Sequence, residues 1–245
     1  MRALTDNVVI VTGSSSGIGE AAARAFGAEG CKVVVNSSSS VEAGEKVAAS
    51  LPDAIYVQGD VSREADCDAL VAAAMERWGR LDVLVNNAGT TKVIPHRDIQ
   101  AAGEDVWRRI LDVNVLGTWL MSRAAAASLA LGDGGSIINV SSVAGLRPGG
   151  SSIPYACSKA AVNHMTRLLA KVLGPEVRVN AVAPGLIDTP WTSDWDTPKA
   201  NTAKMAPLRR VGTVDDIAHV CVFLAQADYT TGEIVTSDGG VQLGI

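Results

Sequence analysis

The sequence predicts an α/β fold in a single domain, namely a doubly wound parallel sheet of about seven strands with helices on both faces. Short runs rich in β-branched residues alternate with Ala-rich stretches of helical pattern along the 245 residues. The chain is 47% hydrophobic but only 4% aromatic, so Ala, Val, Leu and Ile must build its core. Such a core is typical of a parallel sheet that helices bury on both faces.

The predicted elements follow one another in a regular order. Strands are expected at Val8–Thr12, Lys32–Asn36, Ala54–Gln58, Val83–Asn86, Ser136–Val140, Val177–Ala183 and Ile234–Thr236. Helices are expected at Gly17–Glu29, Val41–Ser50, Arg63–Trp78, Asp105–Leu131, Pro154–Leu173 and Val214–Gln226. Repeated strand–helix units imply right-handed crossovers between parallel strands. No linker rich in Pro, Ser or Gly divides the chain, so we expect one domain over residues 1–245.

The stretch 185–211 breaks this rhythm, because it carries three prolines and shows no clean period. A long irregular segment in a compact domain is usually functional or disordered. A loop packed by its own tryptophans, Trp191 and Trp195, is one interpretation. We favour a substrate-covering lid at about 186–211, because this stretch follows the carboxyl end of a strand, where open α/β sheets bind ligands.

Charge and composition argue against several classes of partner. The net charge is −5 and the pI is about 5.2, and no run of Lys or Arg occurs. We therefore expect neither a nucleic-acid nor an anionic-membrane partner. The four cysteines form no C-x-x-C motif, and the three histidines do not join them at metal-ligand spacing, so no metal site is expected. The N-terminus has no signal peptide and no apolar run is long enough to span a bilayer, which indicates a cytoplasmic protein.

A glycine-rich turn joins the first strand to the first helix. It reads Gly13-Ser-Ser-Ser-Gly17-Ile-Gly19, with the spacing G-x-x-x-G-x-G. Glycines permit a tight turn there and let backbone N–H groups approach a pyrophosphate at the positive end of the helix. The turn therefore predicts a dinucleotide site at Gly13, Ser15, Ser16, Gly17, Ile18 and Gly19.

The same residues satisfy a rival pattern, the nucleophile elbow G-x-S-x-G of serine hydrolases. A hydrolase would need an oxyanion loop from an earlier strand, but only the first strand precedes this turn. It would also need a histidine at a strand end, whereas His164 and His219 lie in helical patterns. We therefore favour the dinucleotide site.

Tyr155 and Lys159 are four residues apart on a predicted helix, so both lie on one face. An ammonium beside a phenol favours the phenolate, which lets the phenol exchange a proton below its usual pKa of about 10. The hydroxyl of Ser142 would meet the same reacting oxygen from another direction, and such a trio suits proton exchange with a carbonyl or alcohol. By itself, however, a Tyr-x-x-x-Lys pair is more often a stacked aromatic with a solvated lysine.

Further motifs decide between these interpretations. Asn-Asn-Ala-Gly at 86–89 follows the fourth strand, Ser142 follows the fifth, and Tyr-Ala-Cys-Ser-Lys at 155–159 lies on the next helix. Together with the glycine-rich turn, and in this order, they resemble the short-chain dehydrogenase/reductase family over essentially the whole length. The resemblance implies a Rossmann-type oxidoreductase that transfers a hydride between a nicotinamide cofactor and a ketone or secondary alcohol.

The resemblance also implies roles for four catalytic residues. Tyr155 would be the general acid in ketone reduction and the general base in alcohol oxidation. Lys159 would lower the pKa of Tyr155 and bind the nicotinamide ribose, and Ser142 would donate a hydrogen bond to the carbonyl oxygen. Asn114, in Asp-Val-Asn-Val at 112–115, would hold a water that links Lys159 to solvent. The alternative for Asn114 is a polar residue that bends its helix.

The family pattern implies further cofactor contacts. Asp60 and Val61 match the adenine contact, although Asp60 would also suit a cap of the next helix. The remaining matches lie on the adenosine side (Asn87, Ala88, Gly89) and beside the nicotinamide (Pro184, Gly185, Ile187 through its backbone, and Thr189 on the phosphates).

The choice between NADP and NAD depends on the end of the second strand. An acidic residue there would bind the ribose hydroxyls of NAD and repel the phosphate of NADP. The chain has Asn36 instead, followed by Ser37 and Ser38, so no carboxylate repels a phosphate and several hydroxyls are at hand. No Arg or Lys stands in the turn to attract it. We favour NADP over NAD.

The expected substrate is a small molecule. The pocket rim at 90–94, 143–152 and the lid is apolar with scattered hydroxyls, which suits a ketone or secondary alcohol of moderate size. The branch closest in appearance is that of the 3-oxoacyl-carrier-protein reductases, whose acidic carrier docks on basic helices. The corresponding helix here, around 122–128, is poor in charge, so carrier docking is not favoured, although Lys171 is one candidate contact.

Relatives pair this helix and the Tyr155 helix between subunits, so the resemblance implies a homotetramer. The alternative is that the small residues of these helices face their own sheet. A second class of function is a catalytically silent dinucleotide-binding regulator or scaffold on the same fold. All four catalytic positions are filled, which favours an enzyme.

Overall fold

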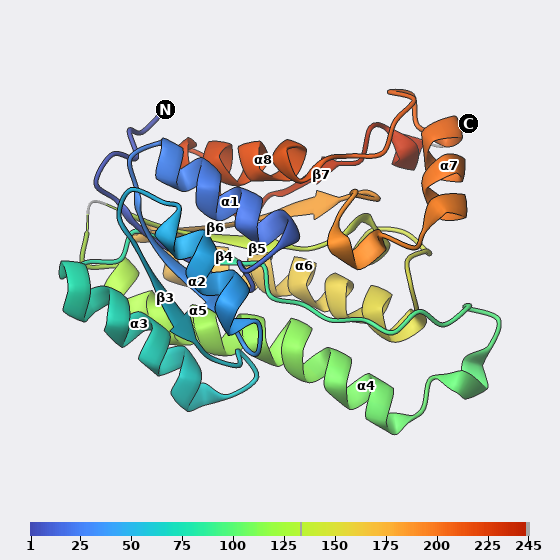
Figure 1. Cartoon of the computed structure of the whole chain (residues 1–245), viewed down its shortest axis with the longest axis horizontal. Coiled ribbons are helices and arrows are strands. Elements are labelled where there is room, and N and C mark those ends of the chain that lie inside the picture. Colours follow the sequence, from blue (N-terminus) through green and yellow to red (C-terminus); the bar gives the residue numbers. More distant parts are fainter. Residues whose placement is uncertain (133, 244–245) are drawn as a thin grey trace.

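A computed structural model of the chain describes residues 1–132 and 134–243. Its centre is a sheet of seven parallel strands in the order β3-β2-β1-β4-β5-β6-β7 (Figure 1). The strand order reverses between β1 and β4, so the sheet is doubly wound and the predicted fold class is confirmed. The strands are β1 (Val8–Val11), β2 (Lys32–Ser37), β3 (Ala54–Gln58), β4 (Val83–Asn86), β5 (Gly135–Val140), β6 (Val177–Pro184) and β7 (Ile234–Ser237).

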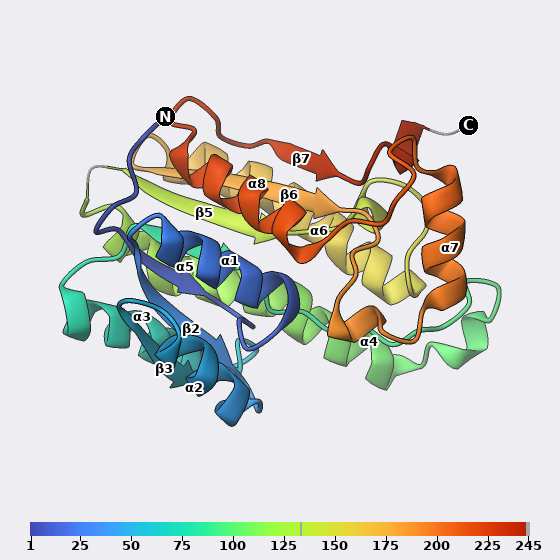
Figure 2. The ribbon, with the colours of Figure 1, turned by 45° about the horizontal axis from the view of Figure 1, so that its top comes forward.

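Helices cover both faces of this sheet (Figures 1 and 2). One face carries α1 (Gly17–Ala28), α2 (Val41–Ala49) and α8 (Val214–Gln226). The other face carries α3 (Glu64–Trp78), α5 (Gly117–Leu129) and α6 (Ile153–Leu173). The two layers explain the aromatic-poor composition, since close helix–sheet packing over both faces is made by small and aliphatic side chains.

Alternation along β1 shows how the sequence produces these layers. Val9 and Val11 pack in the α1–α8 core, whereas Val8 and Ile10 pack in the α3–α5–α6 core, and all four are fully buried. Successive side chains of a strand point to opposite faces, so a continuous apolar run fills both cores at once. Each such burial contributes about 1.5–3 kcal/mol.

The predicted helix at 105–131 is wrong in one respect, because three segments take its place. These are α4 (Glu104–Leu111), a π-helical turn at Asp112–Leu116, and α5. The apolar pattern continues through the turn, so the sequence does not reveal it. Single π-turns inside α-helices often mark functional sites, and this one contains Asn114. The other predicted bounds differ from the structure by at most one residue.

The segment predicted to be irregular contains a helix, α7 (Asp196–Met205), after a 3₁₀ turn at Pro190–Thr192. No residue of α7 is buried. A helix without a buried face needs no apolar period, which is why the sequence pattern does not reveal it. Its place as a substrate lid stays a prediction.

The carboxyl ends of all seven strands lie at one edge of the sheet, because the strands are parallel. In Figure 2 the arrows of β5, β6 and β7 point toward the side on which α7 lies. The glycine-rich turn, the 86–89 motif and Ser142 all follow strand ends, so the fold brings them to this one edge.

Candidate active site

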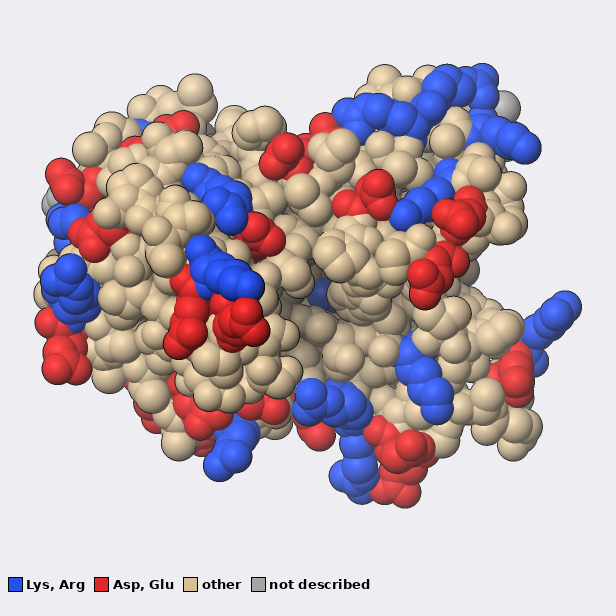
Figure 3. All heavy atoms as spheres, viewed as in Figure 1, with Lys and Arg blue, Asp and Glu red and all other residues tan. Residues whose placement is uncertain are grey.

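A cleft of about 1170 Å³ opens at the carboxyl edge of the sheet. Figure 3 shows a hollow in the middle of the molecule's face, between the part that carries α1 and α2 and the part that carries α7. All of the predicted site residues line the cleft except Gly19 and Asn114. The volume exceeds the roughly 300–1000 Å³ of pockets for single ligands. There is room for a dinucleotide beside a second molecule.

The glycine-rich turn adopts the conformation that its glycines allow. Gly13 and Gly17 have φ of +61° and +59°, in the left-handed region that disfavours other residues. A Cβ on Gly13 would stand 2.9 Å from Cα of Ala88, so the two turns touch through backbone. The fit to a pyrophosphate is good, since Ser15, Ser16 and Ile18 of the helix start line the cleft.

Gly19 is required for the packing of the turn. It does not line the cleft, and a Cβ there would collide with the carbonyl of Gly13 and the side chain of Asn87. Gly19 therefore allows α1 to pack closely beneath the turn, and its contact with the cofactor stays a prediction.

Asn87 ties the 86–89 motif to the glycine-rich turn. Its Nδ2 donates to the carbonyl oxygens of Thr12 and Gly13, both at 2.9 Å. In return the buried Thr12 Oγ1 accepts from the backbone N–H groups of Asn87 and Ala88, both at 3.0 Å. Thr12 is absent from the predicted site, although a hydroxyl at the very end of a strand was an available signal.

Asn36 lies at the edge of the cleft, but its side chain is already used. Its Oδ1 accepts from Gly13 N at 3.2 Å, and its Nδ2 donates to the carbonyls of Val57 and Gly59, each at 3.1 Å. The Ser37 hydroxyl is paired with the Tyr56 hydroxyl at 2.9 Å. Asn36 is thus a brace of the turn, and the exposed hydroxyls at this strand end are those of residues 38–40.

Asp60 and Val61 line the cleft after β3. Burial raises the pKa of Asp60, but hydrogen bonds from Ser62 and the charges of Arg109 and Arg63 outweigh it and hold this pKa below its ordinary value. The N-cap residue of α3 is Arg63, so the alternative in which Asp60 itself caps this helix is wrong. Arg109 Nη1 lies 3.8 Å from Asp60 Oδ2 and also lines the cleft, which the sequence did not indicate.

Tyr155 and Lys159 lie one turn apart near the start of α6, where the Ser152 hydroxyl caps the helix by accepting from Tyr155 N. Lys159 Nζ lies 5.7 Å from the Tyr155 ring centroid and donates to the Val140 carbonyl at 2.8 Å. Burial lowers the pKa of Lys159 to about 8. Burial also raises the pKa of Tyr155, and a hydrogen bond with Ser142 opposes that rise.

Ser142 stands at the end of β5, and its Oγ accepts from Ala144 N at 3.1 Å. Accepting from an N–H leaves the hydroxyl proton of Ser142 available for donation. The neighbouring Ser141 is buried, and its hydroxyl donates to the Lys159 carbonyl at 3.3 Å. Both serines line the cleft, but the Ser142 hydroxyl is hydrogen-bonded with Tyr155, whereas the Ser141 hydroxyl is used on the backbone of α6.

Asn114 is buried behind the cleft in the π-helical turn. Its side chain donates to Thr90 O at 3.0 Å and to Ser158 Oγ at 2.9 Å, and accepts from Thr90 N at 2.8 Å. A Cβ on Gly89 would stand 3.5 Å from Asn114 Oδ1 and 3.8 Å from Lys159 Nζ, so both groups approach the same point. The water-holding role stays a prediction, whereas the bracing of α6 against the 90s loop is observed.

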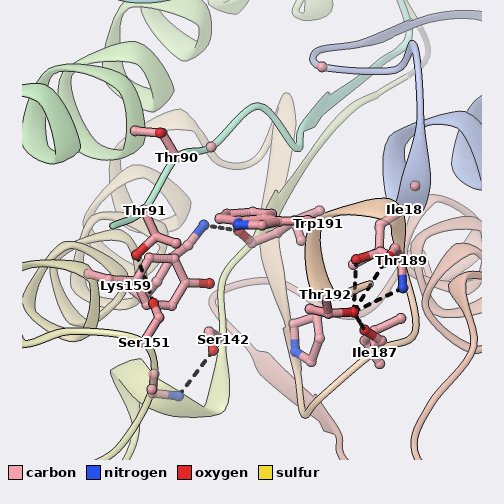
Figure 4. Close-up of a pocket in the computed structure, with 18 of the residues that line it drawn as sticks. Ile18, Thr90, Thr91, Ser142, Ser151, Lys159, Ile187, Thr189, Trp191 and Thr192 are labelled. Atoms are coloured by element: carbon pink, nitrogen blue, oxygen red, sulfur yellow. Dashed lines mark hydrogen bonds between the residues drawn. The ribbon is translucent and has the colours of Figure 1, made fainter. Parts of the chain in front are cut away.

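The first part of the predicted lid lies opposite the glycine-rich turn. Thr189 Cβ would be 3.8 Å from a Cβ on Gly17, and Ile187 and Thr189 both line the cleft with Pro184 and Gly185. The phosphates of a dinucleotide on the turn would therefore meet Thr189. Figure 4 shows Thr189, Thr192 and Ile187 gathered on one side of the cleft and Ser142, Ser151 and Lys159 on the other.

Two kinds of feature are missing from residues 1–132 and 134–243. No helix among them has both the length and the apolar character needed to cross a membrane. No group of three or more His, Cys, Asp and Glu side chains among them is arranged to hold a metal ion.

Comparison with known proteins adds to this geometry. Residues 13–242 match a family model described as enoyl-(acyl carrier protein) reductase. A protein of Streptomyces violaceoruber, named as a ketoacyl reductase of the granaticin polyketide synthase, is 57% identical over 239 residues, which are 96% of each chain. A 3-oxoacyl-[acyl-carrier-protein] reductase of Synechocystis sp. is 38% identical over 252 residues, or 98% of this chain and 99% of the relative.

Solved structures agree with the sequence relatives. One described as a short-chain dehydrogenase/reductase from Burkholderia xenovorans has a TM-score of 0.91 and 37% identity, with 98% of this chain and 99% of that chain covered. The aldohexose dehydrogenase of Thermoplasma acidophilum has a TM-score of 0.89 and 30% identity over 99% of this chain and 96% of its own. Because the family model and these relatives all cover nearly the whole chain, it belongs to the short-chain dehydrogenase/reductase family and is an oxidoreductase that uses a nicotinamide dinucleotide.

Proposed function

We propose that this enzyme reduces a ketone of moderate size with NADPH, and oxidises the corresponding alcohol in reverse. The observation that carries the proposal is the convergence of Tyr155, Lys159 and Ser142 in the cleft that also contains the glycine-rich turn. Filled catalytic positions favour this activity over a silent dinucleotide-binding scaffold.

The chemistry divides between cofactor and protein. When bound, the reduced nicotinamide supplies the hydride. Ser142 donates a hydrogen bond to the carbonyl oxygen and stabilises the negative charge that develops there. Tyr155 gives its phenolic proton to the same oxygen, and the Lys159 ammonium stabilises the phenolate that is left. Asn114 would hold the water through which Lys159 recovers a proton from solvent.

The first substrates to test are 3-ketoacyl thioesters, because relatives are named as ketoacyl and 3-oxoacyl-carrier-protein reductases. Docking of an acidic carrier on α5 is not favoured, since Arg123 of that helix is ion-paired with Glu64. Lys171 is exposed on α6 and is one candidate contact. A 3-ketoacyl group on a small thiol is therefore expected to be turned over at least as readily as the same group on a carrier protein.

The test is the loss of NADPH absorbance with a panel of ketones that includes 3-ketoacyl thioesters of a small thiol and of a carrier protein. Turnover of at least one ketone is expected. Tight NADPH binding without turnover of any of them would contradict the proposal and support the scaffold alternative.

NADP is the cofactor that the end of β2 favours. No carboxylate stands there to repel a 2′-phosphate, and the exposed hydroxyls of residues 38–40 are available to bind it. Replacement of Ser38 by Asp is expected to raise KM for NADPH about tenfold or more while changing KM for NADH less, because like charges repel in this open turn. Steady-state kinetics with both cofactors measure the shift.

The matched control for Ser38→Asp is Ser38→Ala, which removes the hydroxyl without adding charge. A change of no more than a few-fold is expected there. Wild-type protein that prefers NADH over NADPH in kcat/KM would contradict the choice of NADP.

A homotetramer is the proposed assembly, with α5 and α6 paired between subunits. Trp119 on α5 is 42% exposed, and Leu168 and Val172 on α6 are 53% and 69% exposed, so these large apolar side chains form one patch. Apolar patches of this kind commonly mark protein interfaces. Tyr155 lies near the start of α6, so pairing of this helix between subunits would also hold Tyr155 in place.

Charge at the centre of this patch should break the assembly. Replacement of Leu168 by Glu is expected to reduce the mass measured by light scattering to half of the wild-type value or less, because an interface does not accommodate an unpaired buried carboxylate. Ile99→Glu, at a residue 66% exposed outside the patch, is the control and should leave the mass unchanged. A monomeric wild-type protein would contradict the tetramer.

A further inference from the structure

Trp191 contacts the catalytic tyrosine directly. The ring centroids of Trp191 and Tyr155 are 6.3 Å apart, and the ring planes meet at 86°, which is the edge-to-face arrangement that aromatic pairs favour. Trp191 lines the cleft and is 50% exposed, so about half of its surface is free to meet a ligand. The mechanism proposed above does not use this residue.

The turn that carries Trp191 is held firmly. Thr192 is buried, and its hydroxyl donates to the Ile187 carbonyl at 2.8 Å while it accepts from Thr189 N at 3.1 Å. Farther along, Lys199 Nζ of α7 lies 2.6 Å from Asp188 Oδ1. These contacts hold the Pro190–Thr192 turn and the start of α7 against residues 187–189, which follow β6. Trp191 is therefore positioned by its own backbone and not only by packing against a ligand.

The site has chemically different sides. In Figure 4, Trp191 lies toward the side of the cleft that carries Ile187 and Thr192, whereas the side that carries Lys159 also carries two further cleft residues, Thr91 and Ser151. Their hydroxyls are 2.7 Å apart and are hydrogen-bonded to each other. A carbonyl that receives a proton from Tyr155 must lie within hydrogen-bond reach of the phenol, hence between these two sides. One substituent of that carbonyl then faces an indole and the other faces hydroxyls.

We propose that Trp191 is a specificity-determining residue, which selects ketones with a flat, extended apolar substituent on the lid side and holds the ring of Tyr155 against that substituent. This inference rests on the proposed ketone reduction, and it adds the substrate class. An indole offers a large rigid apolar surface, so flat groups gain more from it than a methyl group does. Its edge contact with Tyr155 also limits rotation of the phenol.

The experiment compares two ketones with the same reacting group, one with only small alkyl substituents and one with a flat bicyclic substituent. Wild-type protein is expected to prefer the bicyclic ketone. Trp191→Ala should lower kcat/KM for the bicyclic ketone at least tenfold more than for the small one, chiefly through KM. Trp191→Phe should restore most of the preference, because it keeps a flat ring.

Trp107→Phe is the matched control, because this α4 tryptophan does not line the cleft, and it should leave the ratio at the wild-type value. NADPH titration checks that each variant is folded; if Trp191→Ala fails to bind NADPH, Trp191→Leu and Trp191→Phe decide the ratio. An unchanged ratio, or an equal fall for both ketones, would overturn the role of Trp191. No turnover of any ketone by the wild-type protein would instead overturn the proposed function.

Discussion

Replacement of Tyr155 by Phe is expected to lower kcat about 10³-fold while the dissociation constant of NADPH stays nearly unchanged. The change removes the one proton that the site can give directly to the carbonyl oxygen, and general acid catalysis of this kind contributes about 10²–10⁴-fold. Phe keeps the ring that packs against Trp191, so the cleft should retain its shape. Steady-state kinetics measure kcat, and NADPH titration measures the dissociation constant.

The control for this variant is Tyr229→Phe, because Tyr229 is fully exposed and distant in sequence from the catalytic motifs. Its kcat should equal that of the wild type. If Tyr155→Phe retained more than about a tenth of wild-type turnover, the acid–base role of Tyr155 would be refuted.

Replacement of Lys159 by Met is expected to lower kcat about 10²-fold or more without lowering the thermal midpoint of unfolding. The Lys159 ammonium is buried beside the Tyr155 ring, where its charge is costly to the fold but stabilises a phenolate. Met has a similar length and no charge, so it keeps the packing and removes only the electrostatic effect. The measurements are steady-state kinetics and thermal unfolding.

The charge of Lys159 should also determine how folding stability and turnover depend on pH. Burial lowers the pKa of Lys159 to about 8 from 10.5. Between these two values the unfolded chain binds a proton that the folded chain does not, so folding stability should rise with pH there. Ketone reduction should instead slow as pH rises through about 8, because the Tyr155–Lys159 pair then loses the proton that supports transfer. Lys159→Met should lack this break near pH 8.

Lys171→Met, at an exposed lysine of the same helix, is the control, and with a small-molecule ketone its kinetics and pH profile should match the wild type. A Lys159→Met variant with wild-type kcat across the whole pH range would contradict the proposed partnership.

Much of the fold and of the site could be predicted because the governing physics is local. Strand alternation with Ala-rich helical stretches defines the doubly wound sheet, and parallel strands bring Ser142 and the glycine-rich turn to one edge. The spacing of Tyr155 and Lys159 puts them on the same face of α6 without any tertiary information.

The parts that could not be predicted depend on contacts between distant segments. The Asn36 amide, at the predicted cofactor-selecting position, donates to the carbonyls of Val57 in β3 and of Gly59 just beyond that strand. Arg109 reaches Asp60 across almost fifty positions of the chain. The local sequence pattern predicts neither pairing, because a side chain that is hydrogen-bonded within the protein has the same local pattern as one that faces a ligand.

The π-helical turn at Asp112–Leu116 joins α4 to α5 and adds one residue to a helical turn. In a regular α-helix each residue advances the direction of its side chain by about 100°, so the wider turn rotates α5 relative to α4. Arg109 of α4 can thereby line the cleft, while Met121 and Ala125 of α5 are buried against the sheet. Asn114 lies in the π-helical turn between these two helices. The number of residues in this turn, as well as the identity of Asn114, therefore determines which side chains reach the site.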